Sequence, residues 1–276
     1  MLTPELIEDF RRDGAVRVRG AFTHDEVALV ERGIERNLAE PSERALIASR
    51  DDDAGRFVED FCNWQRIPEY EQFIRSSQAA AIAGQLMGTG RVRLYHDHML
   101  VKEPGTRQRT PWHQDQPYYN IAGSQTCSLW MPVDPVSRES TLEFVAGSHL
   151  GPWLMPRTFM DSQARWFPEG SLQDLPDIEA DREAFPIVGW ELEPGDGVFF
   201  HMLGATRRRQ GRRRSPPPRV LGALHGRRCR ARAAGLAHVS GIPRPDGAAG
   251  GGCADGHAAV PRALDQSRLD DRSISP

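Results

Sequence analysis

A ten-residue stretch from Thr110 to Tyr119, TPWHQDQPYY, constrains this chain more than any other part of its sequence. His113 and Asp115 stand two residues apart within it. Side chains alternate along a β-strand, so on a strand both would leave the same face. An imidazole and a carboxylate that converge on one point supply two of the three ligands of a 2-His-1-carboxylate iron site. The stretch therefore predicts a strand that carries part of a metal site and needs one further ligand.

The chain has 276 residues, enough for one large domain or for one domain with an appendage. The sequence has no apolar run near the roughly 20 residues that a membrane helix needs. Its start, MLTPELIEDF, lacks the basic and apolar pattern of a signal peptide. The four cysteines have no C-x-x-C spacing, which favours free thiols over a zinc site or a disulfide framework. These features predict a cytoplasmic protein.

The basic residues are distributed unevenly in type and in position. The formal net charge of −3 combines an acidic first part with a strongly basic stretch after Gly204. Lys102 is the only lysine, and arginine supplies the other 34 of the 35 basic residues, which suggests a GC-rich gene. A lone lysine shortly before His113 and Asp115 suits a carboxylate-binding role as a point charge. An ordinary surface lysine is the alternative.

Hydrophobic periodicity and turn residues predict helices first and mainly strands afterwards. Thr3 is expected to cap a helix that ends near Arg12, and Thr23 a second helix through Leu38, both packing against a sheet. One or two more helices are expected over 70–87. Strands are expected over 15–20, 91–103, 110–119, 128–134, 141–149 and in two segments of 190–203, with a lid-like insertion over 153–186. Short strands with Gly- and Pro-containing turns indicate a barrel or a jelly roll.

His96 and His98 share one face of the expected strand over 91–103. They are candidate metal ligands, and with His113 they would allow a cupin-like metal site. Two histidines with one residue between them are also a frequent coincidence, so both interpretations stay open. Tyr118 and Tyr119 either shape a substrate pocket or belong to the core.

Five stretches, in this order, resemble the phytanoyl-CoA dioxygenase family of iron(II)- and 2-oxoglutarate-dependent oxygenases. They are LYHDHMLVKEPG, WHQDQPYY, SLWMPVD, FVAGSH and PGDGVFFH, and they cover most of residues 2–203. The resemblance implies a double-stranded β-helix (a cupin-like jelly roll), mainly β with flanking helices. It implies His113 and Asp115 as iron ligands, Lys102 as a contact of 2-oxoglutarate, and Trp130 as a weaker candidate near that contact.

The sequence departs from the family pattern at the third ligand. That pattern resembles FFHxLxLHG, whose second histidine binds iron, whereas this chain reads FFHMLGATRR. His201 matches the first histidine, which is not the ligand, and Thr206 fills the ligand position. The arginine that would bind the 2-oxoglutarate carboxylate has no clear match. Gln114 is expected to point to the other face and to be structural, and no catalytic residue beyond the metal ligands is assigned.

Beyond Leu203 the composition changes to arginine, alanine, glycine and proline. We interpret residues 1–203 as an incomplete jelly-roll domain and residues 204–276 as a disordered tail that is out of frame. Read one base later, the codons of Gly204–Arg208 permit Ala-Leu-His-Gly, which restores the missing histidine. Two later stretches permit family-like strings in the same frame. The alternative to this frameshift is a genuine basic tail that is disordered or binds nucleic acid.

The resemblance thus implies an oxidoreductase that uses iron(II), 2-oxoglutarate and O2 to hydroxylate a small-molecule substrate. Without the distal histidine, we expect the chain as written to be inactive. A catalytically silent jelly-roll binding protein with a basic, nucleic-acid-binding tail is the alternative, although nucleic acid is the less favoured partner. No membrane partner is expected, and nothing in the sequence selects the substrate.

Overall fold

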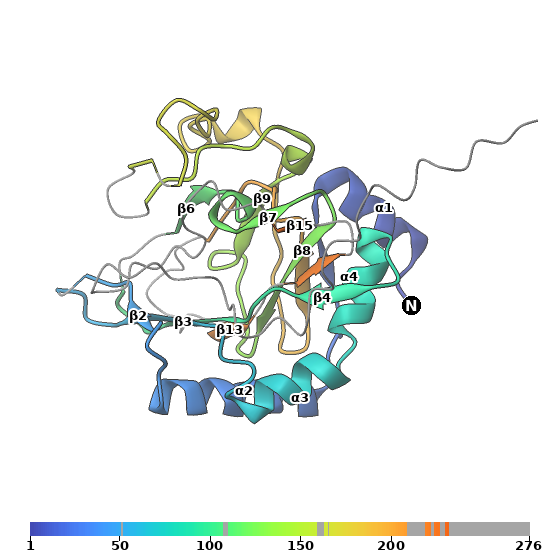
Figure 1. Cartoon of the computed structure of the whole chain (residues 1–276), viewed down its shortest axis with the longest axis vertical. Coiled ribbons are helices and arrows are strands. Elements are labelled where there is room, and N and C mark those ends of the chain that lie inside the picture. Colours follow the sequence, from blue (N-terminus) through green and yellow to red (C-terminus); the bar gives the residue numbers. More distant parts are fainter. Residues whose placement is uncertain are drawn as a thin grey trace, which may run out of the picture.

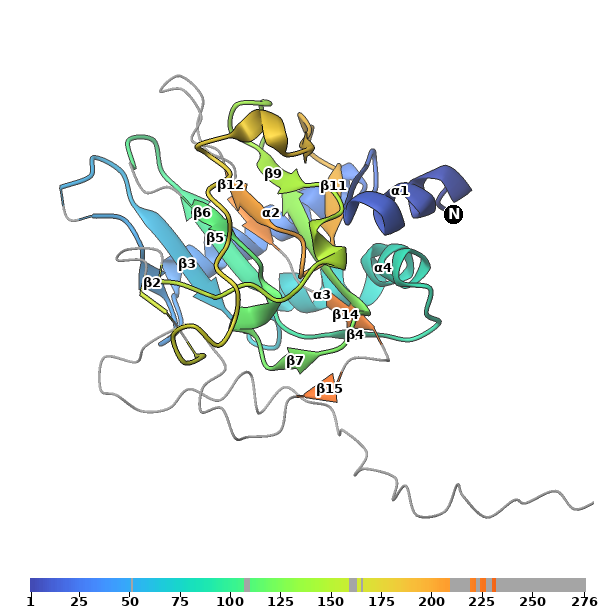
Figure 2. The ribbon, with the colours of Figure 1, turned by 90° about the horizontal axis from the view of Figure 1, so that it is seen from above.

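The computed structural model describes residues 1–50, 52–106, 110–158, 163–164, 166–208, 219–221, 224–226 and 230–231. These residues form two antiparallel sheets, a larger and a smaller one, with helices against the outer face of the larger sheet (Figure 1, Figure 2). A third sheet has two short strands. The arrangement is the expected mainly-β fold with flanking helices.

The first helix, α1 (Pro4–Asp13), begins and ends where its sequence signals predict. The Thr3 side chain caps the N-terminus, and proline occupies the first turn. The helix ends at Gly14, whose φ of +79° is left-handed. A Cβ at Gly14 would lie 2.4 Å from the ring of His149, so both the conformation and the close approach require glycine.

Three further helices complete the helical layer. In α2 (His24–Ala39), Thr23 and Glu26 form a capping box in which each side chain accepts the backbone N–H of the other residue. The expected helical region over 70–87 is two helices, α3 (Pro68–Ser76) and α4 (Ala79–Met87). Figure 1 shows α2 and α3 side by side along one face of the larger sheet, consistent with their mutual contacts.

The larger sheet has the strand order β1-β11-β8-β13-β5-β3-β2, and β14 pairs with both β4 and β8. Its strands are β1 (Ala15–Val18), β2 (Leu46–Ile47), β3 (Phe57–Phe61), β4 (Val92–Leu94), β5 (His98–Lys102), β8 (Thr126–Pro132), β11 (Gly197–Phe200), β13 (Arg219–Leu221) and β14 (Leu224–Gly226). The smaller sheet has the order β10-β9-β12-β6. Its strands are β6 (Thr110–His113), β9 (Leu142–Val145), β10 (Ile187–Val188) and β12 (Thr206–Arg208). The third sheet pairs β7 (Ile121–Ala122) with β15 (Arg230–Ala231).

Alternation along the strands divides the apolar core into two layers. One face of β5, β8 and β11 packs against the helices through side chains such as Met99, Leu129 and Phe199. The opposite face carries Trp130 and Phe200, which pack with Phe144 of the smaller sheet. We call the faces that the two sheets turn toward each other the inner faces. Burying each such large apolar side chain contributes about 1.5–3 kcal/mol.

The insertion over 153–186 covers the outer face of the smaller sheet. Its described part contains little regular structure besides a short 3-10 helix, Arg182–Ala184, and it is the yellow segment at the top of Figure 1. Ile178 packs there against Trp112 and Val145. The insertion therefore stabilises β6 and β9 from outside.

Two expected strands differ in the structure. The strand expected over 91–103 is broken into β4 and β5 by Tyr95–Asp97. The break follows from Asp97, whose buried carboxylate accepts the backbone N–H groups of Asn63 and Trp64 and so pulls the chain out of the pleat. The first strand expected in 190–203 is only an isolated bridge between Leu192 and Val136.

The sheet continues past the boundary expected at Leu203. Strand β12 pairs with β6 on one side and with β9 on the other, and β13, β14 and β15 also pair with strands of the domain. Most of the tail expected over 204–276 lies outside the described residues. The structure therefore does not test whether this part of the chain is out of frame.

The prediction of free thiols is correct for Cys127, which is buried, but wrong for Cys62, which is disulfide-bonded. Within the described part of the chain, no helix combines the length and the apolar character that crossing a membrane requires.

Candidate active site

His113 and Asp115 meet at the end of β6, with His113 Nε2 lying 3.1 Å from Asp115 Oδ1. The two side chains converge as predicted. They do not do so as neighbours on one face of a strand, so the predicted reason is wrong. The strand ends at His113, and Asp115 has the helical angles φ −70° and ψ −44° because it begins the 3-10 helix Gln116–Tyr118. A turn at the strand end, and not strand alternation, brings the carboxylate to the imidazole.

Neighbouring residues also hold the other ring nitrogen of His113 and the other carboxylate oxygen of Asp115. The Nδ1 of His113 lies 2.9 Å from the backbone oxygen of Pro111, so Nδ1–H donates there and Nε2 is the nitrogen that faces Asp115. The hydroxyl of Ser128 donates to Asp115 Oδ2 at 3.4 Å. Burial alone would lower the pKa of His113, but the Asp115 carboxylate outweighs it and raises that pKa. The pair thus places an imidazole nitrogen and a carboxylate oxygen side by side.

Thr206 lies where a third ligand would be needed. It is the direct Cα partner of His113 across the β6–β12 pair and of Phe144 across the β9–β12 pair. Phe144 belongs to the inner face, so the side chain of Thr206 shares that face. Thr206 is buried, and its hydroxyl donates to the backbone oxygen of Glu143 at 3.0 Å. A neutral hydroxyl that is already engaged is a poor iron ligand.

The donor set therefore fits an iron ion only in part. Across the described residues, no three His, Cys, Asp or Glu side chains gather closely enough to hold a metal ion. This also removes the cupin-like alternative in which His96 and His98 join His113. His98 instead lies 3.2 Å from Glu59 Oε2, and His96 is enclosed by aromatic rings.

Lys102 lies at the end of β5 on the inner face. The sequence left open whether it is a site residue or an ordinary surface lysine. It is buried, which excludes the surface interpretation, and its Nζ lies 4.4 Å above the ring of Phe57. Burial and the nearby charge of Arg208 lower the pKa of Lys102 to about 7, while Glu59 opposes them. A bound carboxylate would favour the charged form of this lysine.

Arg208 is the cationic partner that the sequence did not reveal. It is two residues beyond Thr206 on β12, and its Cα partner Leu142 packs with the inner apolar cluster. Burial lowers the pKa of Arg208 to about 10. The only signal in the sequence was its spacing of two from Thr206, which becomes meaningful only once β12 is known to be a strand. Lys102 and Arg208 thus place two buried cations near each other.

The remaining predicted residues lie in the same region. Trp130 is buried on the inner face of β8. Gln114 is structural as expected, because it donates to the backbone oxygens of Pro152 and Leu203 and accepts from Leu154.

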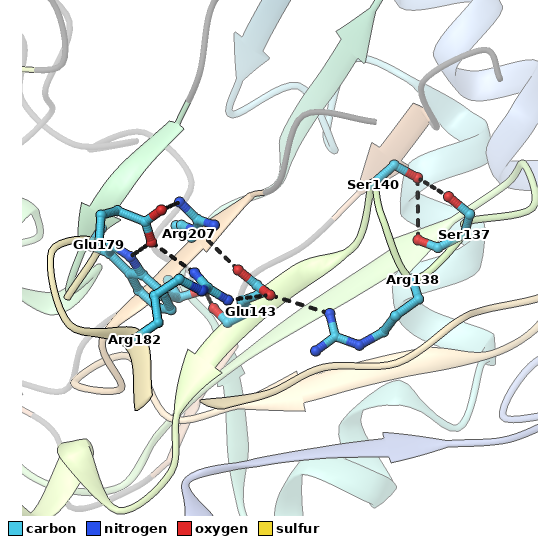
Figure 3. Close-up of polar contacts among 9 residues, drawn as sticks. Ser137, Arg138, Ser140, Glu143, Glu179, Arg182 and Arg207 are labelled. Atoms are coloured by element: carbon cyan, nitrogen blue, oxygen red, sulfur yellow. Dashed lines mark hydrogen bonds and ion pairs between the residues drawn. The ribbon is translucent and has the colours of Figure 1, made fainter. Parts of the chain in front are cut away.

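The outer face of β12 is held by a network around Glu143 (Figure 3). Glu143 is fully buried, and its carboxylate pairs with Arg207 and Arg182 at 2.9 Å and with Arg138 at 3.4 Å. Arg207 and Arg182 also bind Glu179, each at 2.7 Å. Because neighbouring residues of a strand face opposite ways, this network places Arg207 outside and Arg208 inside.

A family profile, "Phytanoyl-CoA dioxygenase (PhyH)", matches residues 10–214 of the chain. The match runs through β12 and therefore includes both His113 and the sheet position of Thr206. A search of curated proteins finds no match.

Solved structures share this architecture at low sequence identity. The epimerase SnoN, in complex with Fe3+, alpha ketoglutarate and nogalamycin RO, is 22% identical, with a TM-score of 0.65 over 86% of this chain and 90% of SnoN. The non-heme alpha ketoglutarate dependent carbocyclase SnoK from nogalamycin biosynthesis is 24% identical, with a TM-score of 0.66 over 84% of this chain and 87% of SnoK. EctD from S. alaskensis with bound Fe is 16% identical, with a TM-score of 0.62 over 82% of this chain and 76% of EctD. At these identities the likeness establishes the fold.

Proposed function

Because this chain belongs to the phytanoyl-CoA dioxygenase family of iron(II)- and 2-oxoglutarate-dependent oxygenases, we propose that it is a small-molecule hydroxylase whose iron site lacks one protein ligand. The observation that carries the proposal is the pair His113 Nε2–Asp115 Oδ1, 3.1 Å apart, with Thr206 directly across the sheet. In this proposal His113 and Asp115 are two of the ligands, and the third position is taken by the Thr206 hydroxyl, which donates to the backbone oxygen of Glu143. The chain as written is therefore inactive or nearly so.

The proposed ligands are His113, through Nε2, and Asp115, through its carboxylate. When bound, iron would supply the oxidative chemistry, and O2 would be the oxidant. The protein's own contribution is to orient both ligands: Pro111 fixes the ring through Nδ1, and Ser128 steadies the carboxylate.

The co-substrate 2-oxoglutarate is assigned to the cations of the inner face. Lys102 and Arg208 are buried and lie near each other, so an anion between them would relieve both their desolvation and their mutual repulsion. We assign Lys102 and Arg208 to its distal carboxylate and keep Trp130 as a wall of the same subsite. The substrate is a small molecule, as nogalamycin is in the SnoN structure.

Succinate formation from 2-oxoglutarate with iron(II) and O2 tests this function. The chain as written is expected to form little or none, and Thr206→His is expected to form it because an imidazole would then share the inner face with His113. Thr206→Leu is the matched control, since leucine adds bulk without a ligand atom. If Thr206→His also binds no iron and forms no succinate, while remaining folded, the proposal is wrong.

A frameshift in the gene remains our explanation for Thr206. The nucleotide sequence around codons 200–210, and expression of the gene with one base removed, would test it directly. The corrected protein is expected to regain iron binding and turnover.

The alternative is a silent jelly-roll protein with a basic nucleic-acid-binding tail. The first two arginines of that tail, Arg207 and Arg208, argue against it. Arg207 is paired with Glu143 and Glu179, and Arg208 is buried, so neither is available to a phosphate backbone. The rest of the arginine run lies outside the described residues. Salt-dependent binding to DNA or RNA would favour this alternative.

A further inference from the structure

A second polar group lies on the inner face of the larger sheet, close enough to Lys102 and His113 for the charge of Glu59 to act on both. Glu59 of β3 is the Cα partner of Leu100, and Phe61 that of His98, so these four side chains share one face. Leu100 packs with the inner apolar cluster, which identifies that face as the inner one. His98 Nε2 lies 3.2 Å from Glu59 Oε2.

This Glu59–His98 pair offers hydrogen-bond acceptors that no described residue uses. With Nε2–H of His98 donating to Glu59, Nδ1 of His98 keeps its lone pair, and the second oxygen of Glu59 has no donor among the described residues. The side chains of His98 and Glu59 remain 20% and 16% exposed, so solvent reaches them despite their place on the inner face. Two free acceptors at one point require a donor, either from water or from a ligand.

The neighbouring His96 independently indicates that a hydrogen-bond partner is missing here. His96 is 7% exposed, and both of its ring nitrogens are buried without a hydrogen-bond partner in the described part of the chain. Its ring centroid lies 6.4 Å from that of His98 and 4.9 Å from that of Tyr119. A buried polar group without a hydrogen-bond partner destabilises the folded state, so such groups are rare in folded proteins.

The surroundings of these groups are aromatic. Phe61 stacks on His98 with ring centroids 3.8 Å apart and an angle of 25°, and Tyr95 lies 5.0 Å from His96. The charge of Asp115 acts on both His96 and Tyr119, which places this aromatic wall beside the metal ligands. The neighbourhood therefore combines flat apolar surfaces with a carboxylate and imidazole nitrogens.

We propose that Glu59, His98 and His96 form the substrate subsite, and that it takes a ring-bearing small molecule through a hydroxyl or amine that donates a hydrogen bond. That the ligand of this subsite is the substrate of a reaction rests on the proposed function. The binding itself needs neither iron nor 2-oxoglutarate. Lys102, at the other end of β5, and Arg208 are the cations that the proposed function assigns to 2-oxoglutarate.

Three probes of nearly equal shape test the subsite: 2-phenylethylamine, 2-phenylethanol and ethylbenzene. Their affinity for the full chain in the presence of a metal chelator is measured by ligand-observed NMR. Both donor-bearing probes are expected to bind more tightly than ethylbenzene. In Glu59→Gln the amine is expected to lose about tenfold or more in affinity, because a charge-assisted hydrogen bond becomes a neutral one, while the alcohol changes less.

Glu103→Gln is the matched control, because Glu103 is an acid of the same region whose ion pair with Arg56 is exposed. It should leave all three affinities unchanged. If Glu59→Gln is destabilised, His98→Asn provides a second test, since it leaves the carboxylate and removes the imidazole.

Equal binding of the three probes, no binding of either donor-bearing probe, or equal effects of Glu59→Gln and Glu103→Gln would overturn the assignment. These outcomes are independent of succinate formation by Thr206→His. Failure of the subsite and failure of the proposed function can therefore be told apart.

Discussion

Thr206 and His113 are direct partners across two neighbouring strands, and the side chain at each position faces the same side of the smaller sheet. Directly opposed residues of an antiparallel pair hold their Cβ atoms about 4.5–5.5 Å apart. The sheet thus brings residue 206 beside the proposed ligand His113, and the Thr206 hydroxyl donates instead to the backbone oxygen of Glu143. Under the proposed function, the side chain at position 206 decides whether a third ligand is present.

Metal affinity is expected to respond strongly to position 206. Thr206→His should bind iron(II), or cobalt(II) as a spectroscopic substitute, about 100-fold or more tightly than the chain as written. Changes in the residues that merely support a ligand already cost 10–100-fold, and here a ligand itself is gained. Titration followed by the absorption of cobalt measures this. Equal affinities of Thr206→His and Thr206→Leu would contradict it.

Binding of 2-oxoglutarate is expected to depend on pH through Lys102. The folded pKa of about 7 lies below the usual value for lysine, so the charged form that attracts a carboxylate gains population as pH falls through about 7. The affinity of the metal-free chain for 2-oxoglutarate should therefore rise from pH about 9 to about 6. Isothermal titration measures it. Lys102→Met should abolish the dependence, and Arg56→Met, which removes an exposed cation, should preserve it.

The Glu143 network is expected to stabilise the smaller sheet. Glu143→Gln would leave Arg182 and Arg207 without their buried carboxylate and should lower the free energy of unfolding by about 2–4 kcal/mol. That is less than the largest effects for buried pairs, because these arginines keep contact with solvent. Urea denaturation measures it. Glu169→Gln, which removes an exposed partner of Arg157, should cost less than about 1 kcal/mol.

The same network carries a pH dependence. Burial raises the pKa of Glu143, but its bonds to Arg182 and Arg207 outweigh burial and lower that pKa below the usual value. Its contribution to stability is therefore complete above the unfolded pKa and is lost as pH falls through the folded one. Stability of the wild type should decline with acid more steeply than that of Glu143→Gln.

His96 is expected to oppose stability in mild acid. Burial, then the charge of His98, lowers its folded pKa to about 3, whereas the unfolded pKa is about 6.5. Between these values the unfolded state binds more protons, so stability falls as pH falls. His96→Leu should remove this loss and raise the melting temperature at pH about 5 relative to wild type. A smaller gain than in His149→Leu, a half-buried control, would contradict this.

Replacing His96 is expected to change stability and ligand binding in opposite directions. The same His96→Leu substitution is expected to weaken binding of 2-phenylethanol, because it removes the ring nitrogens that we assign to the proposed subsite and that have no hydrogen-bond partner among the described residues. A variant that is more stable and binds less well is the signature of a residue kept for a ligand.

Some of the fold could be read directly from local sequence. Thr3, Thr23 and Gly14 mark helix ends through backbone chemistry that needs no distant partner, and the structure confirms each position. His113 and Asp115 were also within reach, since their separation of two residues is short enough that either a strand or a turn brings them together.

What could not be read depends on pairing between distant segments. Glu59 and His98 lie 39 residues apart in sequence and meet only through the register of β3 with β5. Arg208 resembles part of a basic tail in the sequence, because its burial comes from β6 and β9, whose nearest residue is 63 positions earlier. A run of arginines has the same composition whether it is solvated or divided between two faces of a strand.

The pairing of β12 has one more consequence. Its hydrogen bonds join backbone to backbone, so they form whatever side chains the strand carries, provided that it can adopt a pleat. A change in the side chains of β12 can therefore leave its pairing with β6 and β9 intact. The backbone of this strand keeps position 206 opposite His113 whichever residue occupies it.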